Sequence, residues 1–266
     1  MIIAFVYGVF WGSFLNVCIF RLPRGSSIVF PSSACPVCKE PIRWWQNIPI
    51  LSYLFLSGKC ASCWSKISIR YPLVELATGF MVVLLWHFDG PLFAPQLAFP
   101  ETLTKAVIPF ACHLILVSLL LVITMIDWDY EIIPDETIYL GTGVGLLCAA
   151  LSHHLLAACV AAILGASFFY AITVVGEFVF LKEAMGLGDV KFALMLGAFL
   201  GINGLAITIF LCFPIGVFLA LFLIVLGLKG RKDYIPFGPA MAIAAFIAFL
   251  WGNSLLEWYI NLRFRV

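Results

Sequence analysis

Long apolar runs separated by short polar stretches dominate the chain. They cover residues 2–20, 72–88, 106–126, 138–151, 155–180, 190–200, 205–228 and 235–251. Each is long enough to predict a helix, and a helix that crosses the bilayer needs roughly 20 apolar residues. The runs 138–151 and 190–200 are shorter, so we expect either that their polar ends lie in a protected cavity or that one of them is re-entrant. The pattern predicts an all-α polytopic membrane protein with about eight transmembrane helices.

The composition excludes a soluble globular domain. Of 266 residues, 64% are hydrophobic and only 11% are charged, and the mean hydropathy is +1.11. A soluble domain of this length could not bury so much apolar surface. The run 2–20 has no basic residue before it but Arg21 and Arg24 after it, which is the reverse of a cleaved signal peptide. We therefore interpret it as the first transmembrane helix.

Basic residues are concentrated in the polar segment that follows. Seven of the fifteen Lys and Arg residues lie there: Arg21, Arg24, Lys39, Arg43, Lys59, Lys66 and Arg70. The positive-inside rule places this segment in the cytoplasm and the N-terminus outside. With eight crossings, the cytoplasmic side carries 12 basic residues and the outer side keeps Lys105, Arg263 and Arg265. We expect a first helix at 1–20, a cytoplasmic domain at 21–71 and the main transmembrane domain at 72–266.

The polar segment contains two Cys-x-x-Cys motifs, CPVC and CASC, with 21 residues between them. Their cysteines are Cys35, Cys38, Cys60 and Cys63. Two such pairs at this spacing suit a tetrahedral Zn²⁺ site. Two disulfides are the alternative, but they need an oxidising compartment, whereas the basic residues indicate the cytoplasm. We favour a structural zinc site, which would supply much of the folding energy of so small a domain.

Two acidic sites flank the middle helices. Asp127 ends the apolar run 106–126 within IDWDYEIIPDE, and Asp189 ends the motif MGLGD. Two apolar runs lie between them, and an even number of crossings returns the chain to the same, cytoplasmic, face. Two close carboxylates share a proton, so one can act as a base on water while the other polarises a carbonyl. Gly186 and Gly188 would let an extended peptide backbone approach Asp189.

The other polar residues have simpler interpretations. We expect Asp129, Glu131, Asp135 and Glu136 to form a solvated connection. Glu75 lies near a helix start, where a carboxylate favours the positive end of the helix dipole. Three histidines show no ligand spacing with an acid or a cysteine, so we interpret them as structural: His113, His153 and His154.

Six ordered blocks carry a resemblance to a known family. They are GSFLNVCIFRLP, the two cysteine motifs taken together, RYPLVELATG, IDWDYEIIPD, GLGDVK and PFGPAMA, and they extend over nearly the whole chain. The chain resembles type IV prepilin peptidases, the bifunctional leader peptidases and N-methyltransferases of type IV pilus and type II secretion systems. These are GxGD aspartic proteases of the bacterial inner membrane.

The resemblance implies roles for individual residues. Asp127 and Asp189 match the catalytic aspartates, and the four cysteines match a zinc-binding tetrad. The implied substrates are prepilins or pseudopilins, cut on the cytoplasmic side after a glycine that ends a short basic leader. The new N-terminal residue is then methylated with S-adenosylmethionine. The residues 72–266 would form the peptidase domain, and no nucleic-acid partner is expected.

Some alternatives stay open. We find no Gly-rich nucleotide-binding loop, so Glu75 and the cysteine domain are candidates for the methyl-donor site, or else the zinc domain only docks substrate. An ion-coupled transporter with Asp189 on a broken helix would need a polar path across the membrane, whereas the acids cluster at one face. A zinc scaffold would leave both aspartates without a role. A zinc peptidase is disfavoured because four thiolates close the coordination shell.

Overall fold

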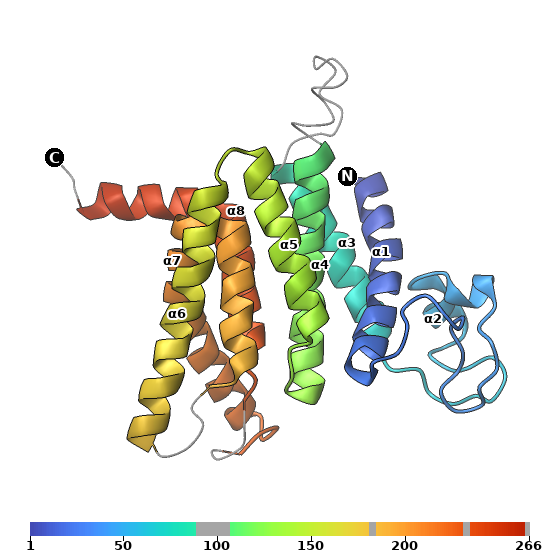
Figure 1. Cartoon of the computed structure of the whole chain (residues 1–266). Coiled ribbons are helices and arrows are strands. Elements are labelled where there is room, and N and C mark those ends of the chain that lie inside the picture. Colours follow the sequence, from blue (N-terminus) through green and yellow to red (C-terminus); the bar gives the residue numbers. More distant parts are fainter. Residues whose placement is uncertain (89–106, 181–184, 231–234, 264–266) are drawn as a thin grey trace, which may run out of the picture. The chain divides into compact units, whose positions relative to one another are not determined.

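The computed structural model describes residues 1–88, 107–180, 185–230 and 235–263 (Figure 1). The basic residues Lys105, Lys182, Arg231, Lys232 and Arg265, which entered the predicted orientation, lie outside these ranges. The α-helices are α1 Ile2–Arg21, α2 Leu51–Phe55, α3 Arg70–Phe88, α4 Ile108–Tyr130, α5 Asp135–Leu151, α6 Leu155–Phe180, α7 Leu187–Val225 and α8 Gly238–Arg263. Two short 3₁₀ helices, η1 Leu22–Arg24 and η2 Trp44–Asn47, lie between α1 and α2.

The predicted all-α membrane fold is confirmed. Within the described residues, six helices are long and apolar enough to cross a bilayer: α1, α3, α4, α6, α7 and α8. Helix α5 has 17 residues and is slightly shorter than a full span. It begins with Asp135 and Glu136, so its polar N-terminal turn favours the membrane boundary.

Helix α7 is two helical arms joined at Gly201. This residue has φ 64° and ψ −172°, a conformation that residues with a side chain rarely adopt. A β-carbon at Gly165 in α6 would lie 2.9 Å from the carbonyl oxygen of Ala193 and 3.1 Å from Leu205 Cδ2. In a straight helix these two residues would be about 18 Å apart. The chain therefore turns back at Gly201, and the predicted runs 190–200 and 205–228 are separate helical segments.

The chain divides into two compact units, residues 1–114 and 115–266. In the first, α1 packs closely against α3 through small residues. A β-carbon at Gly8 would lie 2.9 Å from Gly79 Cα, and one at Gly12 would lie 2.8 Å from Glu75 Cα. Small residues at such crossings let helix backbones approach within a membrane. The cysteine-containing segment connects the end of α1 to the start of α3.

In the second unit, α7 packs against α5, α6 and α8. Phe192, Met195 and Leu196 of its first arm are fully buried. Phe169 of α6, Phe213 of the second arm and Phe237 just before α8 form an aromatic cluster with ring centroids 5.8 to 6.3 Å apart. This core fixes the start of α8 relative to α7, which positions the site described below.

Candidate functional site

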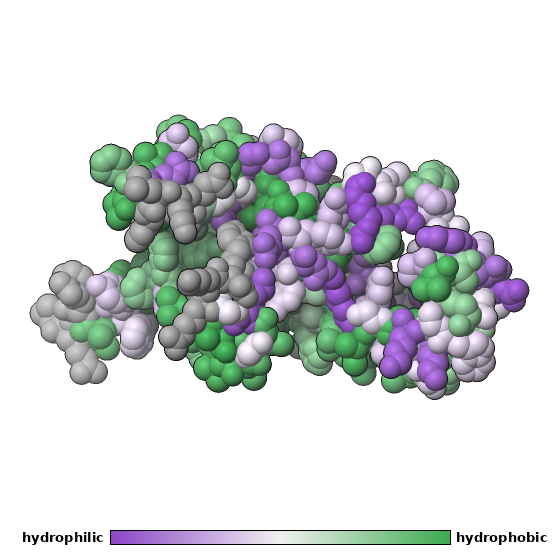
Figure 2. All heavy atoms as spheres, turned by 90° about the horizontal axis from the view of Figure 1, so that it is seen from below, coloured by the Kyte–Doolittle hydropathy of each residue, from purple (hydrophilic) through white to green (hydrophobic). Residues whose placement is uncertain are grey.

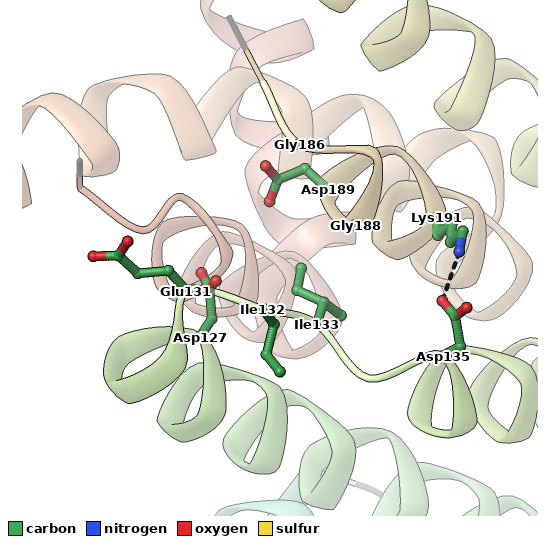
Figure 3. A pocket seen from close by; sticks show the side chains of 9 residues that line it. All are labelled: Asp127, Glu131, Ile132, Ile133, Asp135, Gly186, Gly188, Asp189 and Lys191. Atoms are coloured by element: carbon green, nitrogen blue, oxygen red, sulfur yellow. Dashed lines mark hydrogen bonds and ion pairs between the residues drawn. The ribbon is translucent and has the colours of Figure 1, made fainter. Parts of the chain in front are cut away.

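A pocket of about 240 Å³ opens in the second unit (Figure 3). It lies where the C-terminal end of α4, the connection to α5 and the N-terminal end of α7 meet. Its lining residues are Asp127, Glu131, Ile132, Ile133, Asp135, Gly186, Gly188, Asp189 and Lys191. The two acidic motifs, 62 residues apart in sequence, therefore form a single site.

Asp127 lies in the last turn of α4 and is only 3% exposed. Its carboxylate is held by the start of α8, because the backbone N–H of Gly238 donates a hydrogen bond of 2.9 Å to Oδ2. The approach is tight, since a β-carbon at Gly238 would lie 2.6 Å from that same oxygen. A buried carboxylate needs such a donor to offset the loss of water. The N-terminus of α8 thus fixes the orientation of Asp127.

Asp189 lies in the first turn of α7 and is 4% exposed. Its backbone N–H donates to the carbonyl oxygen of Gly186, the N-cap residue, at 3.1 Å. A carboxylate in the first helical turn is favoured by the unpaired N–H groups and the helix dipole. Figure 3 shows the side chains of Asp127 and Asp189 turned into the same pocket from different helices.

The two glycines of the GLGD motif differ in their surroundings. A β-carbon at Gly188 would lie 3.3 Å from Ile133 Cβ, so the absence of a side chain there makes room for the connection between α4 and α5. At Gly186 the nearest atom to a β-carbon would be Asp189 Oδ2, at 3.8 Å. Sequence reasoning gave both glycines the same role in admitting a peptide. Both glycines line the pocket, so that role stays a prediction, and Gly188 also accommodates Ile133.

Two ion pairs border the pocket. Lys191 of α7 binds Asp135 of α5, with 2.7 Å between Nζ and Oδ1. Lys229 binds Glu131, with 3.0 Å between Nζ and Oε1. All four side chains are partly exposed, so each pair contributes little stability, about 0–1 kcal/mol. These ion pairs join the acidic residues around the α4–α5 connection to the first turn of α7 and to the residues just after α7. The sequence did not predict these contacts.

Gly238 is the pocket-supporting residue that sequence reasoning missed. It stands in PFGPAMA, one of the six blocks that carry the family resemblance. The available signal was a Gly-Pro pair at the start of an apolar run, since proline is favoured in the first helical turn and glycine allows a close backbone approach. Nothing in the sequence indicated that this turn lies against Asp127.

The four predicted metal ligands form a cluster in the first unit. The Sγ atoms of Cys35, Cys38, Cys60 and Cys63 all lie within 4.8 Å of one another. Tetrahedral coordination with Zn–S bonds of about 2.3 Å places sulfurs about 3.8 Å apart. The Sγ atoms of Cys35 and Cys63 are 3.9 Å apart. All four are free thiols, so the cluster fits one metal ion better than two disulfides.

The two knuckles repeat one backbone pattern. In the first, the N–H of Cys35 donates to the carbonyl of Glu40 at 3.0 Å. In the second, the N–H of Cys60 donates to that of Ser65 at 2.8 Å. The backbone N–H groups of Cys38 and Val37 lower the pKa of the Cys35 thiol to about 6. Because the thiolate is the metal ligand, these backbone groups favour the metal-binding form of Cys35.

Glu75 has a different neighbour from the one expected. It is buried in α3, and its Oε2 accepts the backbone N–H of Ile50 at 2.8 Å. Ile50 has φ 60°, which is rare for a β-branched residue. This carboxylate therefore anchors the cysteine-containing segment to the α1–α3 pair, and its assignment to a methyl-donor site stays a prediction.

Comparison with known proteins places the chain in a family. Residues 6–88 match the bacterial peptidase A24 N-terminal domain, and residues 114–221 match the type IV leader peptidase family. The chain is also similar to proteins named prepilin leader peptidase/N-methyltransferase. The one from Pseudomonas aeruginosa is 35% identical to it, over 96% of this chain and 91% of the relative. The relative in Aeromonas hydrophila is 35% identical (97% and 93%) and that in Neisseria gonorrhoeae 36% (97% and 94%).

No solved structure matches the chain. The curated relatives, however, align with it over almost their whole length and include both matched domains. On that similarity, the chain belongs to the type IV leader peptidase family.

Proposed function

We propose that this protein removes the leader from type IV prepilins or pseudopilins and then methylates the new N-terminus. The names of the relatives support both activities. The observation that carries the peptidase half is the burial of Asp127 and Asp189 in one pocket. The distribution of basic residues supports a cytoplasmic site in the bacterial inner membrane.

The two aspartates divide the work of amide hydrolysis. One carboxylate removes a proton from a water molecule, whose oxygen attacks the scissile carbonyl carbon. The other, protonated, carboxyl group donates a hydrogen bond to the carbonyl oxygen. As the tetrahedral intermediate collapses, the C–N bond breaks and the departing amine takes up a proton from the pair. The Gly238 N–H holds the Asp127 carboxylate in place during these transfers.

The position of the site favours a substrate that arrives within the membrane. Both aspartates lie at ends of apolar helices, in the last turn of α4 and in the first turn of α7. A prepilin segment that is helical in the membrane and extended at its leader would present its scissile bond at this boundary. The exposed carboxylates at the pocket border, Glu131 and Asp135, are paired with lysines. They are therefore poorer candidates for the chemistry.

The methyltransferase half would use S-adenosylmethionine, which supplies a methyl group to the N-terminal amine. Within the described residues, the structure gives no group a clear role in holding this molecule. Glu75 is already engaged by Ile50. A test of the whole proposal combines a prepilin substrate with a labelled methyl donor. Cleavage followed by labelling of the mature peptide is expected. A protein that transports ions in proteoliposomes but does not cleave would contradict it.

We also propose that the cysteine cluster binds one structural zinc ion. We expect purified protein to contain about one zinc per chain, and Cys60→Ser to lose it, because three thiolates leave the tetrahedral shell open. Loss of the metal should unfold the segment between α1 and α3, which has little core of its own. Metal analysis and limited proteolysis measure the two effects. Cys112→Ser, which changes a cysteine outside the cluster, is the control.

Metal-free protein in which all four thiols are oxidised would contradict the zinc proposal. Because the thiolates bind the metal, zinc retention should also fall at acid pH. The pKa of the Cys35 thiol is lowered to about 6, so the free thiolate persists above that pH and is lost as the pH falls through it. Bound metal stabilises the thiolate and so keeps it deprotonated to a lower pH. Zinc release is expected on acidification, as protons compete with the metal for the four thiolates.

A further inference from the structure

The segment between α1 and α3 carries a large excess of positive charge. From residue 21 to residue 70 it contains seven Lys and Arg residues and a single acidic residue, Glu40, which together give a charge of +6. Four thiolates holding one Zn²⁺ ion would lower the net charge to +4. Both of its ends are the ends of membrane helices. Any surface that it presents near these ends therefore faces the bilayer boundary. The structure shows two apolar loops held there.

The first loop is anchored to the last residue of α1. The guanidinium group of Arg21 donates from Nη1 to the carbonyl oxygen of Ser27 at 2.8 Å and from Nη2 to that of Pro31 at 2.6 Å. The Ser27 hydroxyl oxygen accepts the backbone N–H of Val29 at 3.2 Å and of Phe30 at 3.3 Å. The loop is thus fixed, yet the side chains of Val29 and Phe30 are 67% and 77% exposed.

The second loop is anchored to the first turns of α3. The bond from Ile50 N–H to Glu75 holds the residue that precedes α2. Within α2, Leu54 and Phe55 are 64% and 84% exposed. Because Gly12, in the second half of α1, packs against Glu75, the two anchors lie at the same end of the α1–α3 pair.

We propose that these two anchored loops, Ser27–Pro31 and Ile50–Phe55, insert into the anionic phospholipid leaflet that α1 and α3 cross. The four exposed side chains would enter the interfacial region, where burying large apolar side chains away from water is favourable. The basic residues would attract anionic headgroups near the membrane surface. Figure 2 shows hydrophilic and hydrophobic side chains intermixed over this segment, at the right of the view.

Charge favours lipid over the other possible occupants. A second copy of this segment, with the same excess of positive charge, would be repelled. A basic prepilin leader would be repelled for the same reason. An aromatic and basic pair elsewhere in the segment has the character of a membrane interface: Arg43 lies over the ring of Trp45, with 5.2 Å from Cζ to the ring centroid. The proposal does not depend on the catalytic roles of the aspartates.

The test uses the whole protein in nanodiscs of phosphatidylcholine, with or without phosphatidylglycerol. Amide hydrogen exchange of the unmodified protein is measured over residues 27–31 and 50–55. We expect several-fold slower exchange in the anionic nanodiscs, and partial recovery of the fast rate at high salt. The interior of α6 serves as the internal control. Equal exchange in both lipids over both loops would overturn the proposal.

A second experiment identifies the occupant directly. A photoreactive benzoylphenylalanine replaces Phe30 or Phe55, and zinc content and prepilin cleavage confirm that each variant is folded. Irradiation in anionic nanodiscs should give phospholipid adducts at both positions, detected by mass spectrometry. Crosslinked dimers, adducts with added prepilin in place of lipid, or no adduct at either position would each overturn the proposal.

Discussion

Asp189→Asn is expected to reduce leader cleavage by at least about 10²- to 10⁴-fold, the usual contribution of a single acid or base. The amide keeps the size of the carboxyl group but can neither remove a proton from water nor pass one to the leaving amine. Asp127→Asn should have the same effect, because the two side chains share one pocket. Rates are measured with purified protein and a prepilin peptide, under conditions where substrate binding is saturated.

Asp135→Asn is the matched control for both variants. Asp135 lines the same pocket but is partly exposed and paired with Lys191 at 2.7 Å. We expect it to retain cleavage within about tenfold of the unmodified protein, because exposed ion pairs contribute little. Methylation of a peptide that already has a mature N-terminus should persist in both Asn variants. Cleavage at the normal rate in Asp127→Asn or Asp189→Asn would exclude the dyad. Loss of both cleavage and methylation in one of these two variants would indicate that it is unfolded.

Gly238→Ala is expected to lower the turnover rate of cleavage about 10²-fold. A β-carbon there would lie 2.6 Å from Asp127 Oδ2 and must displace that carboxylate or the start of α8. Displacing a catalytic group by about 1 Å can cost a factor of this size. Because the peptide-binding surface is otherwise unchanged, kcat should fall with little change in KM. A fall in kcat without a change in KM distinguishes a positioning role from general damage to the fold.

Gly252→Ala is the control on the same helix. A β-carbon at that position would lie 3.4 Å from Ile207 Cδ1, which is ordinary contact, and alanine favours a helix over glycine by about 1 kcal/mol. Cleavage and resistance to thermal unfolding should therefore be maintained. Full activity in Gly238→Ala would show that the hydrogen bond to Asp127 is dispensable. An equal loss in both variants would show that α8 tolerates no added carbon.

The apolar pattern predicted most of the fold because membrane helices leave a strong signal. The short apolar run 190–200 ends just before Gly201, and in the structure the chain turns back at this residue. The parity of the crossings between Asp127 and Asp189 predicted that both lie at one face. Their shared pocket agrees with that expectation. The spacing of the two Cys-x-x-Cys motifs likewise predicted the cluster of four thiols.

Contacts between distant segments could not be read from the sequence. Asp127 and Gly238 are 111 positions apart, and their hydrogen bond depends on how α4 and α8 pack. Glu75 was assigned from its place near a helix start, yet its partner is Ile50, whose strained backbone no local pattern predicted. The contact between Gly188 and Ile133 likewise depends on how the start of α7 packs against the connection between α4 and α5.

The corner at Gly201 makes chirality a structural constraint on this molecule. Its φ of 64° and ψ of −172° are the mirror image of an ordinary polyproline geometry, and nothing lies within 4 Å of a β-carbon built there. The position would therefore accept a D-amino acid but resists any L-residue, for reasons of handedness and not of room. A single achiral residue thus determines that the arm bearing Asp189 runs alongside the one that follows it.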